Sequence, residues 1–254
     1  MYEKMEPLKI STVCANIPDL DAVLSVLYTR LKLAPFLRFD LEATEGVTPV
    51  AFIRIGEHTM ELLGRIKGER PQSGVIHCVE IEAPGQEKTE IELAPETILR
   101  CCPGEQIRLR AIEIMTSLPK EDAAAFIDYT GATMAGPENS LDLCGIAIRL
   151  VETEGIPPKE LPGLFFPGWH RLSVHVPSVS ESYETMSASG SSLESLVEPF
   201  QVMPGHKEAM LSLPSHVILQ LTEESFLKMT PSLAVEWVKS KFSGHRMRFN
   251  TRGK

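Results

Sequence analysis

Polar side chains that could do chemistry stand inside apolar, strand-like runs of this chain. Glu61 lies in TMELLG and His77 lies in GVIHCVEIEAP. A carboxylate or an imidazole in such a place can move a proton or bind a divalent metal ion. Each also has a purely structural interpretation. Glu61 could be the solvent-facing partner in an alternating strand, and a histidine between Ile76 and Cys78 is typical of a buried core.

A third run, WHRLSVHVP, places polar residues on one face of a predicted strand. His175 shares that face with Arg171 and Ser173, and the apolar residues 172, 174 and 176 alternate with them. The strand therefore has one polar and one apolar face.

Several well-known catalytic motifs are missing from the sequence. It contains no GxGxxG, no phosphate-binding GxxxxGK[ST] loop, no HExxH and no GxSxG. Dinucleotide enzymes, P-loop nucleotide enzymes, zinc proteases and α/β-hydrolases therefore lack the loops they require. A Ser/His/Asp triad assembled in space from distant residues stays open.

The elements that would position these residues form a repeated unit of strand, helix and small antiparallel sheet. KISTVCANI alternates as a strand, and Asp19 is placed to cap a helix whose apolar residues recur at 20, 23, 24 and 27. VTPVAFIRI and TMELL follow as two strands. Residues 56–58 between them predict a hairpin turn.

The same order returns twice, and a further copy is incomplete. One copy occupies residues 169–224, and a shorter one combines IRLRAIEIMTS, KEDAAAFIDYTG and LDLCGIAIRLVE. GVIHCVEIEAP opens another copy, but no convincing helix follows it, so we expect that copy to be truncated. The proline-rich stretch EGIPPKELPGLFFPGW predicts a linker whose end, around Trp169, packs onto the protein.

Composition and charge narrow the class of protein. The 254 residues, 43% apolar and 23% charged, are typical of a globular chain of one or two domains. No run approaches the roughly 20 apolar residues of a membrane span, and the N-terminus lacks the layout of a secretion signal. We expect a cytoplasmic protein with no membrane partner. The net charge of −9 argues against nucleic acid as a partner.

Three further features have simple interpretations. Residues 239–254 hold six Lys and Arg and no acidic residue, which is typical of a solvated terminus. The helix predicted over SLAVEWVKSKF is expected to pack on its own domain. The five cysteines match no zinc motif and are expected to be reduced, with a vicinal disulfide between Cys101 and Cys102 as the less favoured alternative.

Short motifs in these units resemble the vicinal oxygen chelate superfamily, which includes glyoxalase I, bleomycin-resistance proteins and extradiol dioxygenases. The resemblance is carried by IPDL at 17–20, Tyr28 near a helix end, the closing strand IGEHTMELLG, and the runs GVIHCVEIEAP, VHVPSVSESYETMSASG and HVILQLTEE. It implies an α+β fold in which repeated βαβββ modules pair into curved mixed sheets that enclose a cavity. We expect residues 1–104 to hold the first module and the truncated second one. Residues 105–254 would hold the later modules, the C-terminal helix and the basic tail.

The resemblance also implies where metal ligands would stand. In metal-using members a divalent ion, such as Fe, Mn, Ni or Zn, binds His and Glu side chains on the first and last strands of the modules. The first-strand position lies six residues before the turn proline, which selects Thr12, Cys78 and Arg171. The last-strand position selects Glu61, Arg149 and Gln220. His77 and His170 lie one residue away from the expected place, so a β-bulge would be needed to make them ligands.

Three functions compete on these residues. The first is a metal-dependent isomerase, lyase or dioxygenase that uses Glu61 as ligand or base with His77, His170 or His175. The second, which we favour slightly, is a metal-free protein that binds a small anionic or oxygen-rich molecule. Its binding residues would be Thr12, Cys78, Arg149, Arg171, Ser173, His175 and Gln220. The third is a scaffold that docks a protein partner. A monomer or a homodimer suits each of them.

Overall fold

The computed structural model describes residues 7–43, 46–66, 70, 75–136, 139–154, 166–188, 193–203 and 206–224. The chain folds as four consecutive modules of strands, three of which contain a helix. The C-terminal helix and the basic tail expected from the sequence lie outside the described residues.

The first module follows the predicted order. Asp19 caps its helix, because its side chain accepts a hydrogen bond from the amide of Ala22 at 3.0 Å. Gly56 forms the hairpin turn with φ +68°, and a Cβ there would lie 2.6 Å from the carbonyl oxygen of Ile107. The elements are β1 (Lys9–Asn16), α1 (Leu20–Leu31), β2 (Pro35–Ala43), β3 (Gly46–Ile55) and β4 (His58–Leu63).

The second module is truncated, as predicted. A turn takes the place of the helix after its first strand, and three strands remain: β5 (Val75–Ala83), β6 (Thr89–Ala94) and β7 (Thr97–Pro103). The predicted division of the chain after residue 104 falls between β7 and the next module and stays a prediction.

The third and fourth modules are complete. The third consists of β8 (Arg108–Thr116), α2 (Pro119–Thr130), β9 (Thr133–Met134), β10 (Ser140–Leu143) and β11 (Ile146–Glu152). The fourth consists of β12 (Gly168–His175), α3 (Val179–Ala188), β13 (Glu194–Met203), β14 (His206–Ser212) and β15 (Ile218–Glu224).

The modules pair in a nested order. The first and fourth form an eight-stranded sheet, β13-β14-β15-β12-β1-β4-β3-β2, and the second and third form a seven-stranded sheet, β6-β7-β5-β8-β11-β10-β9. At the centre of each sheet two first strands run antiparallel, β1 beside β12 and β5 beside β8. Each sheet therefore contains strands from both halves of the chain.

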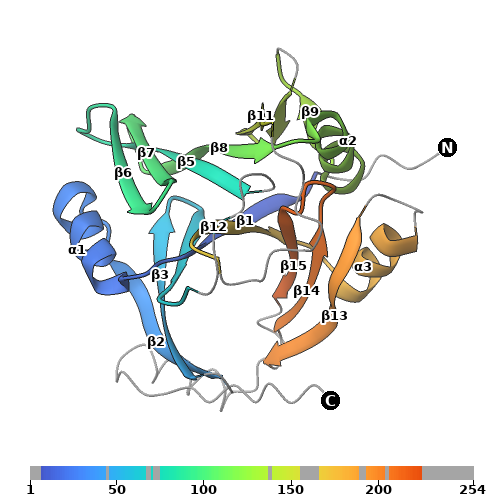
Figure 1. Cartoon of the computed structure of the whole chain (residues 1–254), viewed down its shortest axis with the longest axis horizontal. Helices are drawn as coiled ribbons and strands as arrows, with labels where there is room; N and C mark the ends of the chain where they lie inside the picture. Colours follow the sequence, from blue (N-terminus) through green and yellow to red (C-terminus); the bar gives the residue numbers. More distant parts are fainter. Residues whose placement is uncertain are drawn as a thin grey trace.

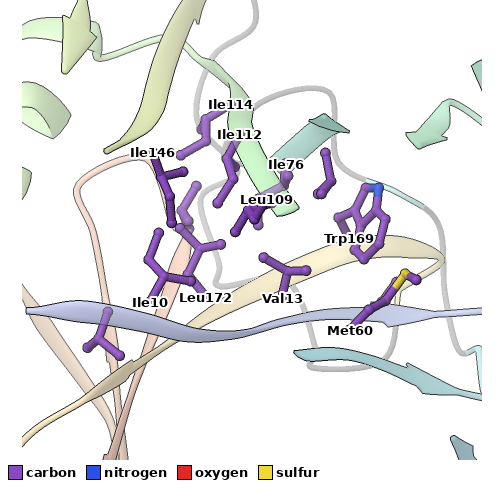
Figure 2. Packing of buried hydrophobic residues seen from close by; sticks show 14 of the residues in the cluster. Ile10, Val13, Met60, Ile76, Leu109, Ile112, Ile114, Ile146, Trp169 and Leu172 are labelled. Atoms are coloured by element: carbon purple, nitrogen blue, oxygen red, sulfur yellow. The ribbon is translucent and has the colours of Figure 1, made fainter. Parts of the chain in front are cut away.

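The two sheets pack back to back. Ile10, Val13 and Leu172 of the eight-stranded sheet point toward Leu109 and Ile112 of the seven-stranded sheet (Figure 2). In the eight-stranded sheet, β2 and β3 stand on one side and β13 to β15 on the other, with α1 and α3 on the outer sides (Figure 1). Because side chains alternate along a strand, the remaining face of this sheet looks away from the core, between its two wings. We call it the inner face.

Specific polar contacts join the two sheets. The indole of Trp169 donates to the carbonyl of Ile98 at 3.0 Å. Asp122 on α2 accepts from the backbone amide of Ser215, in the β14–β15 turn, at 3.0 Å. The predicted packing of the linker end is confirmed, since Phe166 and Trp169 are buried. None of the described helices is both long and apolar enough to cross a membrane.

Candidate ligand-binding face

Each module contributes one cross-strand pair at an equivalent place, between its first and last strands. Each pair consists of directly opposed residues on two parallel strands. The four pairs are Cys14 with Glu61, Glu80 with Arg100, Glu113 with Arg149, and Ser173 with Gln220.

A second equivalent position lies two residues earlier on each first strand. It is occupied by Thr12, Cys78, Ala111 and Arg171, one from each module. The antiparallel pairing crosses the two positions, so that Thr12 lies opposite Ser173 and Cys14 lies opposite Arg171. The positions that the family resemblance assigns to metal ligands are therefore Thr12, Glu61, Arg171 and Gln220 in the eight-stranded sheet. The corresponding residues of the other sheet are Cys78, Arg100, Ala111 and Arg149.

An ion pair occupies the centre of the inner face. The Arg171 Nη2 atom lies 2.7 Å from Glu61 Oε2, with side chains only 11% and 14% exposed. The Cys14 thiol donates to the same carboxylate oxygen at 2.9 Å. Glu61 is therefore the partner of the Arg171 guanidinium on the inner face. It is not the solvent-facing residue of an alternating strand.

Burial and charge keep these groups in fixed protonation states. Burial is the main cause that raises the pKa of the Cys14 thiol well above its ordinary value; Arg171 opposes the shift and Glu61 adds to it. Burial acts to lower the pKa of Arg171, but the carboxylates of Glu61 and Glu208 raise it overall. At neutral pH Cys14 is therefore a neutral thiol and Arg171 a cation.

Bulges bring the two offset histidines into different surroundings. The β1–β12 register shifts next to His170, whose Nε2 atom lies 3.4 Å from Arg171 Nη1. Burial, and then the charge of Arg171, lowers the pKa of His170 well below its ordinary value, so its ring is neutral. The β5–β8 register shifts at His77. This histidine belongs to the seven-stranded sheet, whereas His170 and Glu61 belong to the other sheet.

A chain of hydrogen bonds extends from the ion pair across the inner face. Cys14 Sγ lies 3.9 Å from the Ser173 hydroxyl, which donates to the Gln220 side-chain oxygen at 2.6 Å. Gln220 in turn bonds to the Glu208 carboxylate. His206 lies 2.7 Å from Glu208. Burial would raise the pKa of Glu208, but His206, Arg171 and Gln220 together lower it, so the carboxylate is ionised.

The seven-stranded sheet carries a different cluster at its equivalent positions. Arginines from β7, β8 and β11 surround the Glu80 carboxylate, whose side chain is 7% exposed. The nitrogen–oxygen distances are 3.6 Å for Arg100, 3.2 Å for Arg110 and 3.3 Å for Arg149. Beside them, burial raises the pKa of Cys78 to about 12.

The structure separates the sequence-predicted site residues into two groups. Thr12, Glu61, Arg171, Ser173, His175 and Gln220 belong to the eight-stranded sheet, and Cys78, Arg149 and His77 belong to the other. Within the first group, Thr12 is half-buried, Gln220 is buried and His175 is exposed. Arg149 and Arg171 therefore do not form one anion-binding pair.

Structural comparison identifies the architecture. A candidate dioxygenase from Bacillus subtilis superposes with a TM-score of 0.64 at 12% identity, over 98% of this chain and 99% of that one. Glyoxalase I from Zea mays gives a TM-score of 0.61 at 11% identity, over 93% of this chain and 97% of that one. The chain has the vicinal oxygen chelate fold. Sequence comparison gives no family-model match and no significant match to a curated protein.

The residues at the ligand positions of this vicinal oxygen chelate fold do not suit a divalent metal ion. Glu61 is a carboxylate, but a guanidinium cation already holds it at 2.7 Å. Threonine and glutamine are weak substitutes for the anionic or imidazole ligands of a transition metal. Among the described residues, no group of three His, Cys, Asp or Glu side chains could hold a metal. The predicted set Glu61, His77 and His170 is not brought together.

Sequence reasoning missed several members of these clusters, among them Cys14, Arg100 and Glu208. Cys14 stands two residues after Thr12, so strand alternation could have placed it on the same face. Arg100 is the last-strand partner in the truncated module, where no helix marked the register. Glu208 lies on β14, which contributes no position to the family pattern, and no signal in the sequence pointed to it.

Proposed function

We propose that the inner face of the eight-stranded sheet binds a small anionic or oxygen-rich molecule without a resident metal ion. The observation that carries this proposal is the Arg171–Glu61 ion pair, which stands on two positions that the family pattern gives to metal ligands. A fixed cation there repels a divalent ion and offers N–H donors to oxygen atoms.

The neighbouring groups support recognition of oxygen atoms. The Gln220 amide and the hydroxyls of Ser173 and Thr12 lie on the same face as Arg171. They provide both donors and acceptors beside a cation whose position is set by Glu61. A few fixed polar groups of this kind are what a small-molecule site needs for orientation.

The other sheet is the weaker candidate. Its three arginines converge on one buried carboxylate, Glu80, whereas the Nε atom of Arg171 has no hydrogen-bond partner among the described residues. An incoming anion would have to compete with Glu80, which is buried. We therefore assign the site to the eight-stranded sheet and give Arg149 a structural part. As part of the same proposal, the protein works in the cytoplasm as a monomer or homodimer.

Metal analysis tests the metal-free part of the proposal. The full chain, purified without added metal or chelator, is examined by mass spectrometry for Fe, Mn, Ni and Zn, together with Glu61→Ala. We expect far less than one metal ion per chain in both proteins. A stoichiometric metal content that disappears in Glu61→Ala would overturn the proposal in favour of a metal-dependent enzyme.

Ligand screening tests the binding part. A panel of hydroxy, oxo and carboxylic acids is added to the wild-type chain and to Arg171→Lys, and the shift in melting temperature is recorded. Arg171→Lys keeps the charge but loses the planar fork, so a true ligand should stabilise the wild type more than the variant. Equal shifts in both proteins would show that the acids bind elsewhere.

A further inference from the structure

Aromatic side chains share the inner face with the polar cluster. Along β3, Ala51, Ile53 and Ile55 are buried in the core, so the residues that alternate with them, Phe52 and Arg54, face the other way. Phe52 lies opposite Glu61 in the β3–β4 register. Directly opposed side chains have Cβ atoms about 5 Å apart. An aromatic ring therefore stands beside the carboxylate that holds Arg171.

Phe52 belongs to a group of three phenylalanines that we call the aromatic wall: Phe36, Phe39 and Phe52. The ring of Phe39 stacks on that of Phe52, with centroids 6.0 Å apart and an interplanar angle of 19°. Phe36 is tilted against Phe52 at 6.4 Å, and the Arg54 guanidinium lies 5.0 Å from the centre of the Phe36 ring.

The rings of the aromatic wall are not buried in the core. Phe36 is 40% exposed, and Phe39 and Phe52 are half-buried. Large aromatic rings contribute most when they are buried, and contiguous exposed apolar area commonly marks a binding site. This wall adjoins a polar cluster on one face of the same sheet, so a single bound molecule could contact both.

The Glu61 carboxylate, which neighbours the aromatic wall, has a second oxygen that can accept a hydrogen bond. Glu61 receives its hydrogen bonds from Cys14 and Arg171 on Oε2 alone. None of the described residues donates to Glu61 Oε1. A ligand hydroxyl can donate to that oxygen, while a ligand carboxylate can accept from the guanidinium beside it.

We propose that the ligand of the inner face is a planar aromatic compound bearing hydroxyl and carboxylate groups. Its ring stacks on the aromatic wall, and its oxygens meet Glu61 and Arg171. This inference rests on the proposed function and adds the class of ligand. Offset stacking on Phe52 distinguishes a flat ring from a saturated ring of the same size, because only the flat ring presents a π face.

Calorimetry with two matched acids tests the ligand class. The probes are 3-hydroxybenzoate and 3-hydroxycyclohexanecarboxylate, which carry the same polar groups on a flat and a saturated ring. We expect the wild-type chain to bind the aromatic acid more tightly. Phe52→Leu should weaken binding of the aromatic acid about three- to tenfold and leave the saturated acid unchanged. Tyr28→Leu, which removes an exposed ring from the outer helix α1, is the matched control and should change neither affinity.

The possible failures are distinguishable. If both acids bind equally well and both lose affinity in Arg171→Lys, the proposed function stands and the aromatic class is overturned. If neither acid binds but another acid of the screening panel stabilises the wild type more than Arg171→Lys, the aromatic class is overturned and the proposed function stands; if no acid of the panel does so, both proposals fail. If Phe52→Leu changes the sedimentation coefficient but not the affinity for the aromatic acid, the wall is an interface between copies of the chain, and the ligand class is overturned. The melting temperature of each variant without ligand confirms that it is folded.

Discussion

Replacing Arg171 by methionine keeps much of the volume of the side chain but removes its charge. Among the described residues, only the Cys14 thiol would then donate to the Glu61 carboxylate on the inner face. Removing one partner of a buried ion pair costs about 3–5 kcal/mol. The two side chains are 11% and 14% exposed, so water can reach the carboxylate in part, and we expect the low end of this range.

The expected loss is about 3 kcal/mol in the free energy of unfolding. For a chain of this size it lowers the melting temperature by roughly 6–12 °C. The double variant Glu61→Gln with Arg171→Met removes the stranded charge, so it should recover about half of the loss. The difference between the double variant and the sum of the single variants gives the coupling energy of the pair, which on these values is at least about 1.5 kcal/mol if Glu61→Gln alone does not stabilise the protein.

Urea unfolding followed by circular dichroism measures these values. The matched control is Arg38→Met, because Arg38 pairs with Asp21 at the same distance of 2.7 Å but the side chains are 45% and 75% exposed. An exposed pair is worth at most about 1 kcal/mol. If Arg171→Met costs no more than Arg38→Met, the ion pair is not the organising contact of the inner face, and our reasoning about its burial is refuted.

Three further substitutions or treatments test other contacts. Burial raises the pKa of Asp122 although Ser215 and other groups donate to it. The stability that the protonated carboxyl contributes is therefore fully present below the unfolded pKa and is lost as the pH rises through the folded pKa. In unfolding titrations from about pH 4 to pH 7, the advantage of wild type over Asp122→Asn should shrink, whereas Asp122→Ala, which also loses the acceptor for Ser215, should be about 1–3 kcal/mol less stable than Asp122→Asn at each pH; a constant difference between wild type and Asp122→Asn would contradict the pKa shift. Gly168→Ala should lower the melting temperature strongly, because φ is +106° and a Cβ would lie 2.3 Å from the Thr97 hydroxyl; an unchanged value would show that this close approach relaxes freely. A thiol reagent should modify the exposed Cys144 rapidly and the four buried cysteines only on unfolding, and fast modification of more than one thiol in the native chain would contradict that burial.

The order of elements could be predicted from the sequence because its signals are local. Alternating apolar residues, the Asp19 cap and the Gly56 turn act over a few residues, and the structure confirms the elements they predicted. The nested pairing of the modules could not be predicted in this way. It depends on which sheet edges and core faces fit one another, and residues more than 150 positions apart decide it, as Ser11 and Ser173 show.

The candidate site was predictable in its residue types and less so in its geometry. Counting from turn prolines led to Arg171, and the closing strand led to Glu61, but their direct contact depends on the β1–β12 and β1–β4 registers. A bulge changes which residue faces inward without leaving a mark in the sequence. For this reason the environments of His77 and His170 could be stated only as alternatives.

The nested pairing of the modules has a consequence for how the chain acquires its structure during synthesis. The second and third modules are neighbours in the sequence, so the seven-stranded sheet can form as soon as β11 has left the ribosome. The first module emerges earliest, yet β1 finds its partner β12 only after about 150 further residues have been made. Until then its unpaired strand edge and apolar face are exposed to aggregation, and long-range closure of this kind is slow. Among the described parts of the chain, the inner face of the eight-stranded sheet is consequently the last to be completed.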